Sequence, residues 1–232
     1  MTGTLFIVAT PIGNLQDITT RAIKTLMSVD AIAAEDTRKT GLLLQNIMAL
    51  NNTKRPRLIS YYEQNEMQRI PEIINALKNG LNIALVSDAG TPTISDPGFK
   101  LVREAIREGI RVESIPGPSS VISSLVASGL PTDKFLFVGY PPRKPGHRRK
   151  LLENIASMIR IIRATIIIFE APHKLIRTLE EMKEIFGDIN IVICRELTKI
   201  HEETRREKIS NSIDHFSKGK PKGEFVILFN LF

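Results

Sequence analysis

The sequence contains a single cysteine, Cys194, and no tryptophan among its 232 residues. One cysteine cannot form an intrachain disulfide or a cysteine-based metal cage, and this fits a protein of the reducing cytoplasm. No metal-ligand spacing links the four histidines, which are His147, His173, His201 and His215. We therefore expect no metal site, and we expect the triplet 201–203 (His-Glu-Glu) on a surface helix.

Long apolar runs are also absent. The longest candidate, Thr165 to Phe169, has the length of a strand and falls far short of the roughly 20 residues that cross a bilayer. The first residues lead straight into Leu5–Val8, without the basic stretch, long apolar core and cleavage site of a secretion signal. We expect a soluble, cytoplasmic protein with no membrane partner.

Positive charge is present in excess and is unevenly distributed. Apolar residues make up 42% and charged residues 25%, as in ordinary globular proteins, and the length suits two compact units. Residues 1–118 carry 13 Lys/Arg against 12 Asp/Glu, whereas residues 119–232 carry 19 against 13. Within 134–163 the only acidic residue is Glu153. Such a run is often a solvated helix face, but its concentration here favours a polyanionic partner, namely nucleic acid.

The first half alternates short apolar runs with amphipathic stretches, a pattern typical of a layered α/β domain with a mainly parallel sheet. Runs such as Ile83–Val86 are apolar throughout, as in strands buried on both faces. We expect strands at 5–9, 31–34, 58–61, 82–87 and 112–115, and helices at 20–29, from about 36, at 67–79 and at 98–108.

The rigid turn Pro116-Gly117-Pro118 marks the predicted boundary between an N-terminal domain, 1–117, and a C-terminal domain, 118–232. A helix from Ser119 or Ser120 to Ser128 should open the second domain. Further strands are expected at 135–139, 164–169, 189–194 and 225–229, and helices at 148–161, 175–185 and 210–217, with a basic loop at 141–146. The second domain should be α/β with a mixed sheet.

In open α/β sheets, ligands bind beyond the carboxyl ends of the strands, so the turns there are candidate sites. The first turn, 9–14, has one glycine, which disfavours a dinucleotide fold with its G-x-G-x-x-G pattern. The turn 87–98 has glycines and prolines that permit close backbone approach, and we expect ligand contact at 88–92, with Asp96 capping the next helix. The turns 116–120 and 169–174 complete the set, the latter with Glu170 and His173.

Seven segments carry a resemblance to a known family. They are 9–15 (ATPIGNL), 34–38 (AEDTR), 86–92 with 95–98 (VSDAGTP, SDPG), 116–120 (PGPSS), 170–173 (EAPH), 195–199 (RELTK) and 222–224 (KGE). In this order they resemble the tetrapyrrole methylase superfamily (class III methyltransferases), and within it the branch that methylates a ribose 2′-oxygen, a cytidine's, in small-subunit ribosomal RNA. The resemblance runs from Leu5 to Phe229.

The resemblance implies a homodimer of two α/β domains with S-adenosylmethionine in the cleft between them. The implied cofactor contacts are Pro11, Ala89, Gly90, Thr91, Ile94, Ser119, Ser120, Phe169, Glu170, Leu197 and Gly223. The chain departs from the family at 61–65, where relatives tend to carry histidines, and at Glu207, where they tend to carry glycine. It also lacks a carboxyl-terminal extension of longer relatives, so we expect the grip on RNA elsewhere.

A ribose hydroxyl is a poor nucleophile until a base takes its proton, and the candidate catalytic residues are Glu170, His173, Glu196 and Lys199. Lys199 or Arg195 could instead stabilise an alkoxide or hold a phosphate. Asp36 and Asp88 are further candidates for the base, although capping a turn or helix is an equally good role for each. Substrate RNA is expected along the basic residues of 143–163, 205–208 and 218–222.

Two other interpretations remain open on the sequence alone. A methylase of another branch would act on a tetrapyrrole or on a modified protein histidine. A protein of the same fold could also bind RNA as a ribosome-assembly factor without catalysis.

Overall fold

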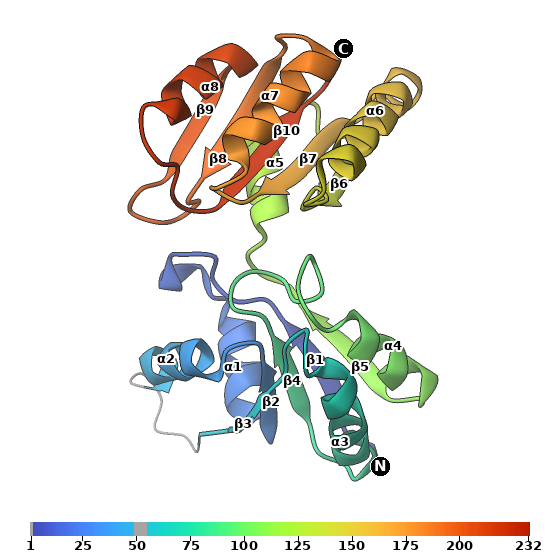
Figure 1. Ribbon diagram of the computed structural model, residues 1–232. Coiled ribbons are helices and arrows are strands. Elements are labelled where there is room, and N and C mark those ends of the chain that lie inside the picture. The colour runs from blue at the N-terminus through green and yellow to red at the C-terminus, as the bar shows by residue number, and fades with distance from the viewer. Residues whose placement is uncertain (1, 49–54) are drawn as a thin grey trace. The chain divides into compact units, whose positions relative to one another are not determined.

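The computed structural model describes residues 2–48 and 55–232. Their contacts divide the chain into two compact units, Met1–Ser119 and Ser120–Phe232. Each unit is built around a five-stranded sheet with helices packed against it (Figure 1). The predicted α/β class is confirmed.

The first unit contains a sheet of order β3-β2-β4-β1-β5 in which all neighbouring strands are parallel. Its strands are β1 (Thr4–Val8), β2 (Ala31–Ala34), β3 (Arg57–Ser60), β4 (Ile83–Val86) and β5 (Arg111–Ile115). Every residue of β2 and β4 is buried, as the apolar runs predicted for strands covered on both faces. The carboxyl ends of all five strands therefore lie at one edge of the sheet.

Helices cover both faces of this sheet and form two apolar cores. One core joins alternate strand residues to α1 (Thr20–Ser28) and α2 (Thr37–Met48), through side chains such as Leu26 and Leu44. The other joins the opposite face to α3 (Glu66–Lys78) and α4 (Phe99–Arg107), through Ile73 and Leu101. A short 3-10 helix, η1 (Leu15–Asp17), lies in the turn after β1. The N-cap of α4 is Gly98, so Asp96 is not the cap that we predicted.

The second unit contains the predicted mixed sheet, of order β6-β7-β10-β8-β9. Strand β6 runs parallel to β7, and the other neighbours are antiparallel. Its strands are β6 (Phe135–Gly139), β7 (Thr165–Glu170), β8 (Asn190–Arg195), β9 (Glu203–Lys208) and β10 (Phe225–Phe229).

Three helices cover one face of the second sheet, namely α6 (Pro145–Ile162), α7 (Leu175–Phe186) and α8 (Ile209–Ser217). Their apolar residues form a single core with alternate residues of β7, β8 and β10. Helix α5 (Ser120–Ser128) packs on β10, and its buried residues Val121 and Leu125 face the sheet.

Three further features differ from the sequence prediction. Strand β9 was not predicted, because five of its six residues are charged and they carry no apolar pattern. The triplet 201–203 lies on a turn and the start of β9 and not on a helix. Helix α6 begins at Pro145, three residues before the predicted start, because proline is favoured at the first helical position. The basic loop is correspondingly shorter.

Candidate functional site

Two of the predicted ligand turns are joined by backbone hydrogen bonds. The N–H of Thr10, after β1, donates to the carbonyl of Gly90 (2.9 Å), and the N–H of Gly90, after β4, donates to the carbonyl of Thr10 (3.0 Å). The Thr10 hydroxyl also donates to the carbonyl of Ser87 (3.4 Å). The two turns meet because β1 and β4 are neighbouring parallel strands. Their backbones are thereby fixed at the carboxyl edge of the sheet.

The third turn of this unit is attached to the same place. The Thr91 hydroxyl donates to the carbonyl of Pro118 at 3.1 Å. Gly90 adopts a φ of +77°, and a Cβ there would lie 3.3 Å from the Ile12 side chain. The conformation and the tight approach both favour glycine at this position. The turns 9–14, 87–98 and 116–118 thus lie together at one edge of the first sheet.

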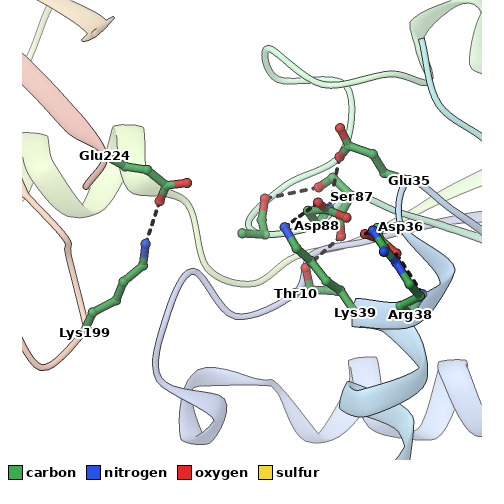
Figure 2. Close-up of polar contacts among 10 residues, drawn as sticks. Thr10, Glu35, Asp36, Arg38, Lys39, Ser87, Asp88, Lys199 and Glu224 are labelled. Carbon is green, nitrogen blue, oxygen red and sulfur yellow. Dashed lines mark hydrogen bonds and ion pairs between the residues drawn. The ribbon is translucent and has the colours of Figure 1, made fainter. Parts of the chain in front are cut away.

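Ionic side chains surround the start of the second turn (Figure 2). The Lys39 ammonium contacts Asp88 Oδ2 at 2.6 Å, and the Asp88 N–H donates to Glu35 Oε2 at 3.1 Å. Within the described part of the chain, Asp88 Oδ1 is buried and accepts no hydrogen bond. A buried acceptor without a donor costs free energy. Asp88 Oδ1, unpaired among the described residues, therefore fits a site where a ligand supplies the donor.

The electrostatics of this cluster are set by burial and by pairing. Desolvation raises the pKa of Glu35, which lies beside the Asp88 carboxylate. The hydrogen bond to Asp88 raises the pKa of Lys39. The Arg38 guanidinium lowers the pKa of Asp36, whose Oδ1 also accepts from the Arg38 N–H (2.9 Å) at the start of α2. Asp36 therefore has the capping role that was one of its two predicted interpretations, and Asp88 remains available for a ligand.

The remaining predicted cofactor residues of the first unit lie along these turns. Pro11 is buried beside Thr10 in the first turn, and Ala89 is half-buried. The Ile94 N–H donates to the Thr91 carbonyl (3.4 Å). Ile94 itself is 43% exposed. Ser119, at the end of the third turn, is half-buried.

In the second unit, Glu170 is buried at the end of β7, with 1% of its surface exposed. Its Oε2 accepts from the Thr178 hydroxyl (2.6 Å) and its Oε1 from the N–H of Ala171 (2.8 Å). Both oxygens are thus engaged within the fold. Beside it, the Phe169 ring makes edge contacts with Phe137 (4.8 Å) and Tyr140 (5.4 Å between centroids).

Glu196 and Lys199 form a second ionic group with Glu224, and Figure 2 shows the contact between Lys199 and Glu224. Lys199 Nζ contacts Glu196 Oε1 at 3.0 Å and Glu224 Oε2 at 2.8 Å, and the Glu224 N–H donates to Glu196 Oε1 at 2.9 Å. Burial works against the charged form of Glu196, but Lys199 and the Glu224 N–H lower its pKa on balance. Burial also opposes the charge on Lys199, yet its two carboxylate partners raise its pKa on balance. Both groups are therefore charged near neutral pH.

The other predicted residues of this unit are placed individually. His173 is exposed in the turn between β7 and α7, and Leu197 is buried in the turn after β8. Ser120 is half-buried at the first position of α5. Gly223 has a φ of +98°, and a Cβ there would lie 2.5 Å from Glu196 Cγ, so only glycine fits beside that side chain.

Part of the basic surface predicted for RNA is occupied by internal partners. Arg148 is 2% exposed and pairs with Glu181 at 2.5 Å. Arg149 pairs with Glu153 and Glu184, and Arg205 pairs with Glu203 and Glu207. Arg206 donates to the carbonyls of Ala127 and Ser128 at the end of α5. Of these four arginines, Arg148 is buried and is thereby withdrawn from the predicted RNA surface, whereas Arg205 is half-buried and Arg149 and Arg206 are exposed.

Sequence reasoning did not single out Lys39 or the contact between Glu35 and Asp88. The segment Ala34–Arg38 contributed to the family resemblance and supplied Asp36 as a candidate base, and Lys39 follows it directly. The sheet topology is the signal that could have found this contact. Strands β2 and β4 are parallel neighbours, so the residues that follow them lie at the same edge of the sheet.

The described residues contain no helix long and apolar enough to cross a membrane. Within the same ranges, 2–48 and 55–232, no group of three or more His, Cys, Asp or Glu side chains is placed to hold a metal ion.

Comparison with known proteins gives a family match over most of the chain. Residues 4–212 match the family model of the tetrapyrrole (corrin/porphyrin) methylases. A protein of Thermotoga maritima named ribosomal RNA small subunit methyltransferase I is 48% identical over 228 residues, which cover 98% of both chains.

Solved structures share the fold at low sequence identity. A cobalt precorrin-4 methyltransferase superposes with a TM-score of 0.70 at 18% identity, covering 97% of this chain and 94% of the other. A uroporphyrin-III C-methyltransferase of Thermus thermophilus, in complex with S-adenyl homocysteine, superposes with a TM-score of 0.65 at 17% identity and covers 97% of each chain.

Proposed function

The chain belongs to the tetrapyrrole (corrin/porphyrin) methylase family, and from this premise we propose that it transfers a methyl group from S-adenosylmethionine to a ribose 2′-hydroxyl, a cytidine's, of small-subunit ribosomal RNA. The observation that carries the proposal is the 48% identity, over 98% of both chains, to a protein named as a small-subunit ribosomal RNA methyltransferase. The named relatives with a tetrapyrrole substrate share only the fold, at 17–18% identity. We also propose that the protein is cytoplasmic and forms a homodimer.

The turns that meet around Gly90 are proposed to hold the cofactor. The match of this fold to a methyltransferase bound to S-adenyl homocysteine supports that class of ligand. Gly90 presents backbone without a side chain, and Asp88 Oδ1 offers a buried acceptor without a donor. Both features fit a ligand that carries amino and hydroxyl groups. The residues proposed for contact are those implied by the family motifs, at Pro11, Ala89–Thr91, Ile94, Ser119, Ser120, Phe169, Glu170, Leu197 and Gly223.

S-adenosylmethionine supplies an activated methyl group on a sulfonium, so the chain mainly has to orient the attacking oxygen and accept its proton. Orientation of reactants contributes about 7–11 kcal/mol in well-aligned systems. A positioned base contributes a factor on the order of 10²–10⁴. The fixed backbones of the three turns suit the first task, because their mutual hydrogen bonds leave little to reorganise on binding.

Among the candidate bases, geometry favours His173 and Glu196. Glu170 already accepts two hydrogen bonds inside the second unit, and Lys199 is held in its charged form by two carboxylates. His173 is exposed and forms no hydrogen bond with the described residues, and Glu196 receives both of its donors at one oxygen. We propose Glu170 as a support for the end of β7 and Lys199 as the residue that positions Glu196.

The test is a map of ribose methylation in small-subunit RNA from cells that lack the gene. The map should lose one 2′-O-methyl group, and adding the pure protein with S-adenosylmethionine to the mutant subunits should restore it. An unchanged map would sink the proposal. The methyl group of S-adenosylmethionine can be labelled with an isotope. If methylation is restored but the new methyl group carries no label, the proposal also fails.

The same preparation distinguishes the alternatives. If calorimetry detects binding of S-adenosylmethionine while no RNA is methylated, that result would favour another substrate class, and tetrapyrroles would be tested next. Absence of that heat at high cofactor concentration, together with binding to subunits, would favour a non-catalytic assembly factor.

A further inference from the structure

The second unit contains a cavity of about 270 Å³ whose lining includes two of the predicted site residues, Glu196 and Gly223. It is lined by Arg195, Glu196, His201, Lys222 and Gly223. These residues come from the end of β8, the turn before β9 and the turn before β10. Four of the five are ionisable, and the volume lies below the roughly 300–1,000 Å³ of typical cofactor pockets.

Arg195 is held in a fixed orientation at this cavity. Its Nε donates to the Lys222 carbonyl at 2.7 Å, and its Nη1 lies 3.4 Å from Glu203 Oε2. The guanidinium also stands over the Phe225 ring, 5.9 Å from the centroid. These contacts engage two of its three nitrogens and leave Nη2 without a partner among the described residues. A guanidinium fixed in this way is prepared to donate to an oxyanion at low entropic cost.

The other side chains add positive charge and donors. Lys222 and His201 are exposed, and neither side chain has a hydrogen bond or ion pair with a described residue. The carboxylate of the lining, Glu196, is compensated by the Lys199 ammonium and the Glu224 N–H. Glu203 lies next to Arg195 but is shared with Arg205 at 3.1 Å. The donors of Lys222 and His201 therefore have no partner in the described part of the chain, whereas the carboxylates of Glu196 and Glu203 are paired.

The backbone around the cavity is strained. Glu196 and Thr198 have φ values of 50° and 63°, and Gly223 has a φ of 98°. Non-glycine residues in the left-handed region cost of order 1–3 kcal/mol each and collect at ligand sites. Hydrogen bonds hold the turn after β8 against the turn before β10, because the Glu196 N–H donates to the Glu224 carbonyl at 3.1 Å and Arg195 Nε donates to the Lys222 carbonyl at 2.7 Å.

We infer that this cavity binds a phosphodiester group of the substrate RNA, through Arg195, Lys222 and His201. The inference rests on the proposed function, because it supposes an RNA substrate. It gives that substrate a specific contact, whereas Arg148, one of the arginines predicted for RNA, is buried in an ion pair with Glu181. Phosphate contacts of this kind fix the register of a nucleic acid on its protein.

The experiment measures binding of the full-length protein to small ribosomal subunits from cells that lack the gene, over a series of salt concentrations. Lys222→Gln should weaken binding about tenfold, since a charge-assisted hydrogen bond is lost. The magnitude of the slope of log K against log salt should fall by about 0.7–0.9, the value of one phosphate contact. His201→Gln should weaken binding in the same direction. The matched control is Lys183→Gln, which removes an exposed charge of α7 away from the cavity.

Calorimetry with S-adenosylmethionine on the same variants separates the possible outcomes. Unchanged cofactor affinity in Lys222→Gln, with weakened subunit binding, supports the inference. Lost cofactor affinity, or an equal effect of Lys183→Gln on the salt slope, overturns it, because the cavity is then a cofactor subsite or the attraction is diffuse. A wild-type protein that neither binds nor methylates subunits would overturn the proposed function itself.

Discussion

At the scale of the residue, the buried pair of Arg148 and Glu181 tests whether Arg148 stabilises the fold instead of contributing to the basic surface. Arg148 donates through Nε and Nη2 to the two Glu181 oxygens, at 2.7 and 2.5 Å. Glu181→Gln leaves a guanidinium that is 2% exposed without its counter-charge, and we expect a loss of about 3–5 kcal/mol in the free energy of unfolding. Urea denaturation measures it. Glu184→Gln, whose carboxylate is 61% exposed, should cost less than about 1 kcal/mol.

The same pair predicts a dependence on pH. The hydrogen bonds from Arg148 lower the pKa of Glu181 below its ordinary value of 4.5. A carboxyl whose pKa is lowered on folding stabilises the protein above its unfolded pKa and loses that contribution as pH falls through its folded pKa. The difference in stability between wild type and Glu181→Gln should therefore be constant near neutral pH and shrink below about pH 4.5. A difference that stays constant down to pH 2 would contradict the pairing.

Gly90 provides a residue-scale test of the proposed cofactor site. Gly90→Ala must accept a φ of +77° and a Cβ 3.3 Å from Ile12, at the place where the turns meet. We expect S-adenosylmethionine affinity to fall at least about tenfold, measured by calorimetry, because a tenfold loss needs only about 1.4 kcal/mol. Gly109→Ala has a similar φ of +68° with nothing within 4 Å. It should show a comparable loss of stability and unchanged cofactor affinity, and equal effects on affinity would exclude a local role for Gly90.

The residues that could be predicted from sequence are those whose roles follow from backbone chemistry. Glycine and proline between strands and helices predicted the turns at 9–14 and 87–98, and the structure joins these turns through Thr10 and Gly90. The partner of a charged side chain could not be predicted in this way. Arg148 has the same sequence context as its exposed neighbours, and only the packing of α6 against α7 shows that it is buried.

At the scale of the element, strand β9 shows how a predicted RNA contact becomes structural. Arg206 lies opposite Val192 in the ladder, on the face that carries α5, and donates to the last carbonyls of that helix. Such donors stabilise a helix end by satisfying orphan carbonyls and by favourable interaction with the helix dipole.

We expect Arg206→Gln to destabilise the protein by about 1–3 kcal/mol, since the carbonyls lose a charged donor. The slope of subunit binding against salt should stay unchanged. Lys208→Gln, at an exposed position of the same strand, should show the opposite pattern, with normal stability and a reduced slope. Urea denaturation and subunit binding measure the two effects, and a reduced slope in Arg206→Gln would return that residue to the RNA surface.

The elements themselves were largely predictable, and the exception has a physical cause. Apolar runs such as Ile83–Val86 and Ile227–Phe229 report burial directly, so their strands were predicted within one or two residues of the observed bounds. Strand β9 is an edge strand stabilised by cross-strand pairing with β8, and its mostly charged sequence carries no burial signal. Pairing of this kind is decided by the neighbour and not by the strand's own residues.

At the scale of the whole molecule, each unit has an apolar core of its own. Helices on both faces of the first sheet form two core clusters, and the second unit has a single large core with α6, α7 and α8. Domains of roughly 100 residues with a complete core can fold independently. The division of the chain at Ser119 and Ser120 leaves every strand of each sheet within one unit.

We therefore expect the fragment 120–232 to fold alone, with a cooperative urea transition and an m-value of about 1–3 kcal/mol/M. Its near-ultraviolet circular dichroism should show ordered aromatic contacts such as that of Phe216 with Phe225. The fragment 164–232 is the matched control, because it lacks β6 and α6 and so exposes Ile166 and Ile168 of the core. That shorter fragment should unfold without cooperativity. A non-cooperative transition in 120–232 would mean that its core depends on the first unit, contrary to the packing around β7, β8 and β10.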